Sequence, residues 1–196
     1  ASFPILDPSL AAEVPPEARV VRSPILEFYG LYRAAAGALP RGENQNLATT
    51  ARPGRGLRGR VLHGLRAAFF IPDGRVGWLP GGTHAGLRVI REEGIEVILA
   101  SGPPFTAHWI ARRLADRTGL PLVLDFRDPW TRAPFYPRRP GPSRILDERL
   151  ERSCLRRADA VLTVNRDIRN DLLARHPDLD AGRFHLVPNG YDPADF

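Results

Sequence analysis

The sequence has little of the sulfur chemistry that many functional sites use. It contains no methionine and a single cysteine, Cys154. One cysteine can form neither an internal disulfide nor a cysteine-rich metal site, which fits a reducing compartment. The N-terminus lacks the basic start and apolar run of a secretory signal. We therefore expect a cytoplasmic protein, and a sequence that begins downstream of its natural start.

Lysine is absent as well, so all 28 basic residues are arginine and the formal net charge is +6. Arginine suits bidentate contacts with phosphate and carboxylate groups. The complete loss of lysine, together with 20 prolines and 18 glycines, indicates a general compositional bias instead. A basic face for nucleic acid, anionic lipid or a phosphorylated substrate stays open, because charge alone does not choose among them.

Long hydrophobic runs are missing. The uncharged stretch between Glu96 and Arg112 is shorter than a membrane-spanning helix and is interrupted by Gly102, Pro103 and Pro104. With 43% hydrophobic and 26% charged residues over 196 positions, the composition is that of a folded globular chain. The length allows one large domain with a buried core.

The first seventy residues form the less regular part of the chain. We expect a short strand over 18–22, a helix over 25–36 and a surface loop over 37–56, which is rich in glycine, proline and arginine. The end of this loop carries Arg52, Arg55, Arg58, Arg60 and Arg66. These arginines form either a solvated arm or a basic surface that contacts anionic lipid headgroups.

From residue 71 onward, apolar patterns of strand and helix type alternate. Strands are predicted over 95–100, 120–126, 160–164 and 183–187, and helices over 78–93, 104–118, 143–157 and 167–175. Such alternation predicts an α/β fold, namely a Rossmann-like parallel sheet with helices on both faces. For the helix over 143–157 we expect an outer Glu148–Arg152 pair and a buried stripe of Ile145, Leu146, Leu150, Cys154 and Leu155.

In sheets of this type, ligands bind beyond the carboxyl ends of the strands. The first strand is followed by Ser101 and Gly102, then by Pro103, Pro104 and, two residues on, Thr106. The two prolines remove amide donors that a phosphate-binding loop would use, and no Gly-x-Gly-x-x-Gly motif occurs, which disfavours a nicotinamide-dependent enzyme. The hydroxyls of Ser101 and Thr106 either contact a polyhydroxylated ligand or cap the following helix.

The second strand ends in the most informative run, Asp125-Phe126-Arg127-Asp128-Pro129-Trp130. Two carboxylates and a guanidinium at the end of a buried strand are costly to desolvate unless they pair or meet a ligand. In a functional interpretation, Asp125 or Asp128 binds or deprotonates a hydroxyl, Arg127 holds an anionic group and Trp130 stacks on a sugar or ring. In a structural one, an internal arginine–aspartate pair fixes the loop and Trp130 anchors it.

The last two strands contribute fewer candidates. Asn165 follows the third strand, and Asn189-Gly190 after the fourth permits a turn with positive φ. Asp192-Pro193 is a helix-start signal close to the end of the sequence, so we expect the natural protein to continue. Histidines are scattered without metal-ligand spacing, and we predict no metal site.

Several of these segments, taken in order, resemble the N-terminal domain of family 4 glycosyltransferases of the GT-B architecture. They are Pro72-Asp73 with Trp78, Ala-Ser-Gly-Pro-Pro-Phe-Thr-Ala-His from Ala100, Asp-Phe-Arg-Asp-Pro-Trp from Asp125, Arg-Ala-Asp-Ala-Val from Arg157, and Val-Pro-Asn-Gly-Tyr-Asp from Val187. The resemblance covers residues 70–196 firmly and the first seventy loosely.

The resemblance implies an enzyme of two Rossmann-like domains that transfers a sugar, with retention, from a nucleotide sugar to an acceptor, without a metal or other cofactor. Residues 101–106 and 125–130 would line the acceptor side, and Asn189, Gly190 and the residues up to Asp192 would lie near the interdomain crossing. Arg127 stands where relatives often have a histidine.

By the same resemblance, residues 71–196 form the acceptor-side portion and residues 1–70 its irregular beginning. The nucleotide-sugar domain is expected after Phe196 and a central first strand before Ala1, and without that strand we expect exposed sheet edges, filled by another segment or chain. The fragment alone should be inactive.

The alternative is a non-enzymatic module that binds nucleic acid or an anionic membrane through its arginines. The absence of aromatics from residues 52–66 disfavours nucleic acid. Peripheral contact with the inner membrane face stays open.

Overall fold

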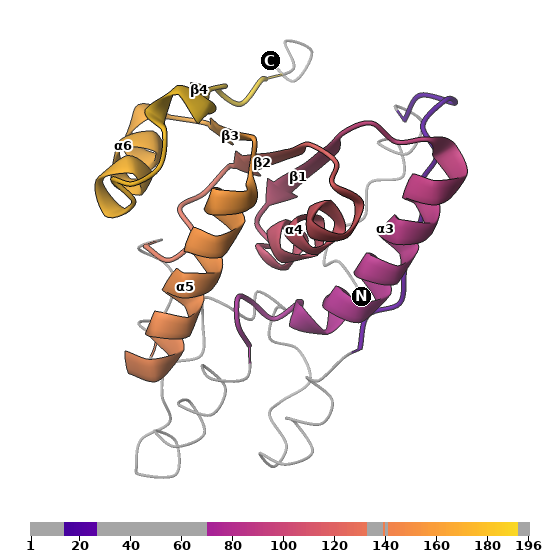
Figure 1. Ribbon diagram of the computed structural model, residues 1–196, viewed down its shortest axis with the longest axis horizontal. Coiled ribbons are helices and arrows are strands. Elements are labelled where there is room, and N and C mark those ends of the chain that lie inside the picture. Colours follow the sequence, from indigo (N-terminus) through magenta and orange to yellow (C-terminus); the bar gives the residue numbers. More distant parts are fainter. Residues whose placement is uncertain (1–13, 27–69, 133–138, 140, 192–196) are drawn as a thin grey trace.

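The computed structural model describes residues 14–26, 70–132, 139 and 141–191. Its elements run in the order η2 (Val76–Trp78), α3 (Leu79–Glu93), β1 (Ile98–Gly102), α4 (Thr106–Thr118), β2 (Leu122–Phe126), α5 (Gly141–Arg157), β3 (Ala160–Thr163), α6 (Arg166–Arg175), η3 (Ala181–Arg183) and β4 (Phe184–Leu186) (Figure 1). Each predicted strand and helix from residue 78 onward is confirmed, with boundaries shifted by up to three residues.

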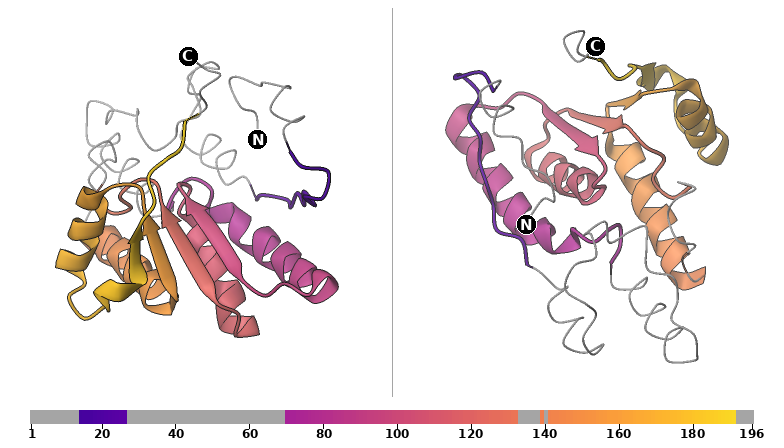
Figure 2. Two further views of the ribbon diagram at one scale, coloured as in Figure 1. Left: turned by 90° about the horizontal axis from the view of Figure 1, so that it is seen from above. Right: turned by 180° about the vertical axis from the view of Figure 1, so that it is seen from behind.

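The sheet is parallel throughout, with strand order β1-β2-β3-β4. Parallel connections are right-handed, so strands that follow one another in chain order carry their connecting helices on one face. Figure 2 shows the described helices on that single face. The burial of the strands agrees, because Ala100, Leu124, Val161 and Phe184 are paired in register and are all buried. The prediction of an α/β parallel sheet is confirmed, although helices were expected on both faces.

Strand β1 begins three residues later than predicted and reaches Gly102. Its pairing starts where the amide of Ile98 donates to the carbonyl oxygen of Pro121, 2.9 Å away. The shift places Ser101 and Gly102 in the strand instead of in the following loop. In the resulting register Ser101 lies opposite Asp125.

The expected strand over 18–22 is not formed, which corrects the prediction. This segment lies beside α3 (Figure 2), where the indole Nε1 of Trp78 donates to Ser23 Oγ at 2.6 Å and the amide of Leu26 donates to the carbonyl oxygen of Gly77. A helix offers no free ladder of backbone groups, so the neighbouring chain has nothing to pair with as a strand. Most of the helix expected over 25–36, the loop over 37–56 and the arginines of residues 52–66 lie outside the described residues.

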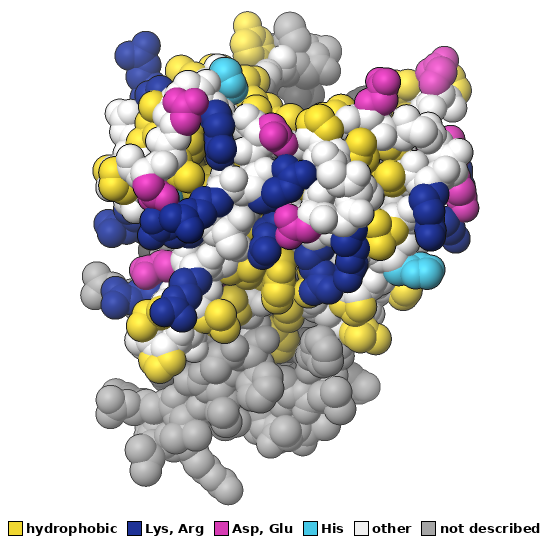
Figure 3. Space-filling model, viewed as in Figure 1, with side chains coloured by type: hydrophobic (Ala, Val, Ile, Leu, Met, Phe, Trp, Pro, Cys, Tyr) yellow, Lys and Arg dark blue, Asp and Glu magenta, His cyan; other side chains and the backbone are white. Residues whose placement is uncertain are grey.

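Helix α5 buries a different stripe from the one predicted. Ile145 and Leu146 are 46% and 56% exposed, whereas Ser143, Asp147 and Glu151 are buried together with Cys154 and Leu155. The expected Glu148–Arg152 pair is replaced as well. Glu148 lies near Arg144, and Arg152 and Arg156 both hold Asp178, so arginines and carboxylates are interspersed on this side of the molecule (Figure 3).

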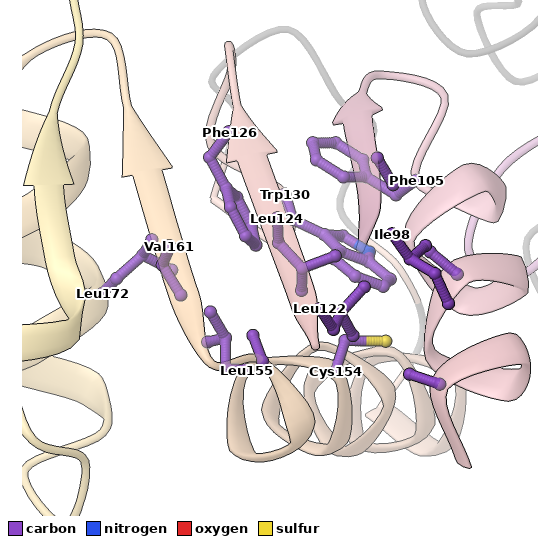
Figure 4. Packing of buried hydrophobic residues seen from close by; sticks show 14 of the residues in the cluster. Ile98, Phe105, Leu122, Leu124, Phe126, Trp130, Cys154, Leu155, Val161 and Leu172 are labelled. Carbon is purple, nitrogen blue, oxygen red and sulfur yellow. The ribbon is translucent and has the colours of Figure 1, made fainter. Parts of the chain in front are cut away.

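The hydrophobic core lies between the sheet and its helices (Figure 4). Helices α3 and α4 approach each other through small residues. A Cβ on Gly82 would lie 2.6 Å from Ile110 Cδ1, and one on Gly86 would lie 2.6 Å from Leu114 Cδ1. Because such distances are too short for carbon atoms, the two glycines set the spacing between the helices.

We predict that Gly86→Val destabilises the fold by about 1–3 kcal/mol, because the added methyl groups overpack the contact with Leu114. Combining it with Leu114→Ala should restore part of the loss, since the side chain that clashes is removed. Urea unfolding of the single and double variants measures both effects. Arg88→Val, on the exposed side of α3, controls for helix propensity; a Gly86→Val loss no larger than that of the control contradicts the prediction.

Candidate functional site

The carboxyl ends of β1 and β2 bring Ser101 and Asp125 together. The register places these two residues opposite each other. Burial alternates along both strands, so their side chains lie on the face opposite to the buried Ala100 and Leu124. Ser101 Oγ donates a hydrogen bond to Asp125 Oδ2 at 2.7 Å. Ser101 is exposed and Asp125 half-buried, so the carboxylate is held in one direction while it stays accessible. A ligand hydroxyl can reach this pair from the strand ends.

Arg127 and Asp128 follow directly. The amide of Arg127 donates to the carbonyl oxygen of Gly102 at 3.0 Å, which ties the end of β2 to the end of β1. Within the described part of the chain, the exposed guanidinium of Arg127 has no ion pair, and Asp128 is half-buried with no side-chain hydrogen bond. The internal arginine–aspartate pair considered from the sequence is therefore not formed. Arg127 thus follows Asp125 by two residues at the end of β2, with no acidic partner among the described residues.

The prediction that Thr106 binds a ligand is wrong. Thr106 is fully buried, and Asp73 holds it through two contacts of 2.8 Å: Oδ2 accepts from the Thr106 amide and Oδ1 from its hydroxyl. The carboxylate of Asp73 thus caps the N-terminus of α4 from a distant loop, where it also matches the helix dipole. Of the same turn, Gly102 is buried and Pro103 is exposed beside Ser101.

The prediction that Trp130 stacks on a sugar is wrong as well. Trp130 is 2% exposed and stacks on Phe105, with ring centroids 4.8 Å apart and planes inclined by 8°. Its indole Nε1 donates to Asp147 Oδ1 at 2.9 Å. The indole is therefore the anchor of the loop after β2 and has no free face for a sugar.

A network of buried charges on α5 supports this loop. Glu151, which is fully buried, accepts hydrogen bonds from the amide and hydroxyl of Thr131 and is paired with Arg175 and His176 of the α6 end. Burial acts to raise the pKa of Glu151, but the hydrogen bond from His176 and the charge of Arg175 hold it below its usual range. Asp147, one helical turn earlier, is 2.9 Å from the guanidinium Nε of Arg139. Burial raises the pKa of the Asp147 carboxyl to about 6, although Arg139 lowers it.

Sequence reasoning did not predict that these carboxylates are buried and hold the loops. Asp73, Asp147 and Glu151 stand in a loop and on a charged helix, where acidic residues are usually solvated. The available signal was spacing, because Asp147 and Glu151 lie four apart, on the same side of the helix as Cys154 and Leu155. Their partners come from segments distant in sequence, which no local pattern identifies.

The remaining candidates do not join the Ser101–Asp125 pair. Asn165 Oδ1 accepts from the amide of Ile168 at 2.9 Å, so this residue caps α6. Asn189 and Gly190 are exposed in the segment after β4, whose start is fixed where the amide of Val187 donates to the carbonyl oxygen of Thr163. Among the described residues only Gly94 and Gly119 have positive φ. The turn with positive φ that was expected at Asn189-Gly190 is therefore not formed.

Neither a metal-binding cluster nor a membrane-spanning helix is found among the described residues. In residues 14–26, 70–132, 139 and 141–191, no group of three or more histidine, cysteine or acidic side chains could hold a metal ion. Within the same ranges, no helix is both long and apolar enough to cross a membrane.

The family model for Glycosyltransferase Family 4 matches residues 29–195. The chain therefore belongs to this glycosyltransferase family, and the predicted resemblance is confirmed. Membership implies binding of a sugar donor and an acceptor. A comparison with curated proteins found no match.

The raised pKa of the buried Asp147 predicts how the stability of the protein changes with pH. The pKa of Asp147 rises from 3.8 in the unfolded chain to about 6 in the folded one, so the folded state binds the extra proton between these values. This residue therefore makes the protein less stable as pH rises from 4 to 6.5, by up to about 3 kcal/mol. Asp147→Asn removes that dependence, while its amide oxygen can still accept from Trp130.

The measurement is urea unfolding of the wild type and Asp147→Asn at several pH values between 4 and 7. The difference in unfolding free energy, wild type minus variant, should decrease as pH rises. Comparing the two proteins cancels the titration of groups that they share. A difference that is constant, or that increases with pH, contradicts the assignment.

Proposed function

We propose that this chain is the acceptor-side portion of a retaining glycosyltransferase that moves a sugar from a nucleotide-sugar donor to an acceptor. Family membership supports the class of reaction. The observation that carries the proposal is the Ser101–Asp125 hydrogen bond at the ends of two neighbouring parallel strands. These strand ends are where α/β sheets bind ligands, and the pair is accessible there.

In this proposal each side chain has a distinct role. Asp125 accepts a hydrogen bond from the acceptor hydroxyl and can take its proton as a general base. Ser101 orients the carboxylate by donating to its other oxygen. Arg127 holds an anionic group of the acceptor, because a guanidinium without an acidic partner is free to form bidentate contacts. Asp128 provides a second carboxylate at the same exit from β2.

Several neighbours shape the site around these groups. Pro103 is exposed just after the Ser101–Gly102 strand end, and Asn165, which lies apart from the Ser101–Asp125 pair, is exposed with its amide nitrogen available. We assign Asn189 and Gly190, which are exposed after β4, to ligand contacts at the end of the fourth strand. Thr106 and Trp130 have no contact with the ligands; they hold the two loops in place from within the core.

The alternative of a non-enzymatic, arginine-rich binding module gains no support from the described residues. Arginines on the helical side are interspersed with carboxylates instead of forming a patch of one sign (Figure 3). Several of them are paired, among them Arg112 with Asp116 and Arg152 with Asp178. Nucleic acid or an anionic surface would require unpaired cations in a continuous stripe.

We predict that Asp125→Asn lowers kcat of the full-length enzyme by at least about 10²-fold, because asparagine keeps the shape of the carboxylate but cannot take a proton. The donor is first identified by surveying nucleotide sugars for transfer or hydrolysis by the wild type. Initial rates of both proteins with that donor then give kcat and KM, and thermal unfolding checks the fold.

Glu148→Gln, which makes the same change of charge on the exposed side of α5, serves as the control and should keep the wild-type kcat. Wild-type turnover by a well-folded Asp125→Asn would remove the role given to this carboxylate. Absence of transfer by the wild type with every donor tested would refute the proposed function itself.

A further inference from the structure

A histidine lies directly beneath the Ser101–Asp125 pair, on the helical side of the sheet. His108, in the first turn of α4, is fully buried. Its ring contacts Phe126 and Trp130 of the β2 end edge-on, with centroids 4.7 Å and 6.0 Å away, and Phe105 at 5.4 Å. The imidazole is thus enclosed by the same aromatic residues that anchor the loop after β2.

One ring nitrogen faces the backbone of the candidate site. His108 Nε2 is 3.1 Å from the carbonyl oxygen of Asp125. A carbonyl oxygen can only accept a hydrogen bond, so Nε2 carries the proton and Nδ1 does not. Burial lowers the pKa of His108 to about 4, which keeps the ring neutral near pH 7. The hydrogen bond therefore persists in one tautomer across the physiological range.

The other nitrogen indicates that packing alone does not account for this residue. Nδ1 is buried and has no hydrogen-bond partner among the described residues. An unpaired buried acceptor is unfavourable, whereas a phenylalanine here would fill similar space without it. The imidazole supplies hydrogen bonding to the backbone of Asp125, and to that of Ala100 as well, which a hydrocarbon ring cannot.

The histidine also constrains the end of β1. A Cβ on Gly102 would lie 2.9 Å from His108 Nε2 and 3.0 Å from Phe105 Cδ1. Only a glycine allows the strand backbone to approach the ring so closely. His108 therefore lies against the ends of both strands that carry the Ser101–Asp125 pair.

We propose that His108 is a positioning residue, which fixes the main chain of Asp125 from the covered face while Ser101 fixes its carboxylate on the open face. The inference rests on the proposed function, because it gives Asp125 the acceptor-binding role. The two restraints act on one residue from opposite sides of the sheet. Loss of either one lets the carboxylate turn away from the acceptor hydroxyl, and small misplacements at a reacting group reduce rates strongly.

The test compares His108→Phe with His108→Gln in the full-length enzyme. Phenylalanine fills the space without a donor, and glutamine can place an amide N–H close to the position of Nε2. We expect His108→Phe to lower kcat at least tenfold with little change in the KM of the donor, and His108→Gln to recover most of it. His84→Phe and His84→Gln, on the exposed surface of α3, are the matched controls and should match the wild type.

A second readout does not require activity. Carbon-13 NMR of the Asp125 carbonyl and carboxyl groups should change in His108→Phe and return toward wild-type values in His108→Gln. Nitrogen-15 NMR of the wild-type ring should show a proton on Nε2 and none on Nδ1 at neutral pH. The ring measurement needs no variant, so it tests the inference even if His108→Phe does not fold.

The outcomes separate the inference from the proposed function. A proton on Nδ1, unchanged Asp125 signals in His108→Phe, or wild-type kcat despite changed signals would each overturn the positioning role. Equal losses of kcat in both variants, with Asp125 restored in His108→Gln, would overturn it too. Changed and rescued Asp125 signals in a protein whose wild type transfers no sugar would support the positioning of Asp125 while refuting the proposed function.

Discussion

The pairing register of β1 and β2 is the constraint on which the candidate site depends. Parallel pairing of Ile98 with Leu122 fixes every later pair, so Ser101 lies opposite Asp125 on the same face. Strand residues alternate between the two faces, so a shift of either strand by one residue would turn its polar side chain into the core. The apolar residues beneath, such as Ala100, Leu124 and Phe126, therefore specify where the polar pair lies.

Buried carboxylates then fix the loops that leave these strands. Asp73 caps α4, Asp147 holds the indole of Trp130, and Glu151 holds Thr131 together with Arg175 and His176 of the α6 end. A buried ion pair gains little net stability, because desolvation offsets the attraction. Here each carboxylate ties a loop to a helix, because it accepts hydrogen bonds from Thr106, Trp130 or Thr131.

The sequence predicted the layers of this protein better than the contacts between its loops. Apolar periodicity identified every α-helix and strand described from residue 79 onward, although not the short 3-10 helix η3, since burial against a sheet imposes a regular pattern. The strand-end rule also placed Ser101 and Asp125 at one edge. It could not tell that Thr106 and Trp130 are buried, because an amphipathic side chain suits a rim and a core equally. The carboxylates that hold Thr106 and Trp130 in the core are Asp73 and Asp147. They lie 33 and 17 residues away from these partners in the sequence.

Helix α5 was predicted with the wrong residues buried in its first half, whereas Cys154 and Leu155 are buried as predicted. Its pattern offers two stripes, one through Ile145 and Leu146 and another through Asp147 and Glu151, and hydrophobicity favours the first. The fold buries the second, because Trp130, Thr131 and Arg175 provide the partners that make burial of carboxylates tolerable. Polar residues that hold loops therefore face the helices, while Ser101 and Asp125 occupy the open face. The groups proposed to bind the acceptor and the residues that hold the loops are separated by the thickness of one sheet, and the hydrogen bond between His108 and the carbonyl oxygen of Asp125 links the two sides.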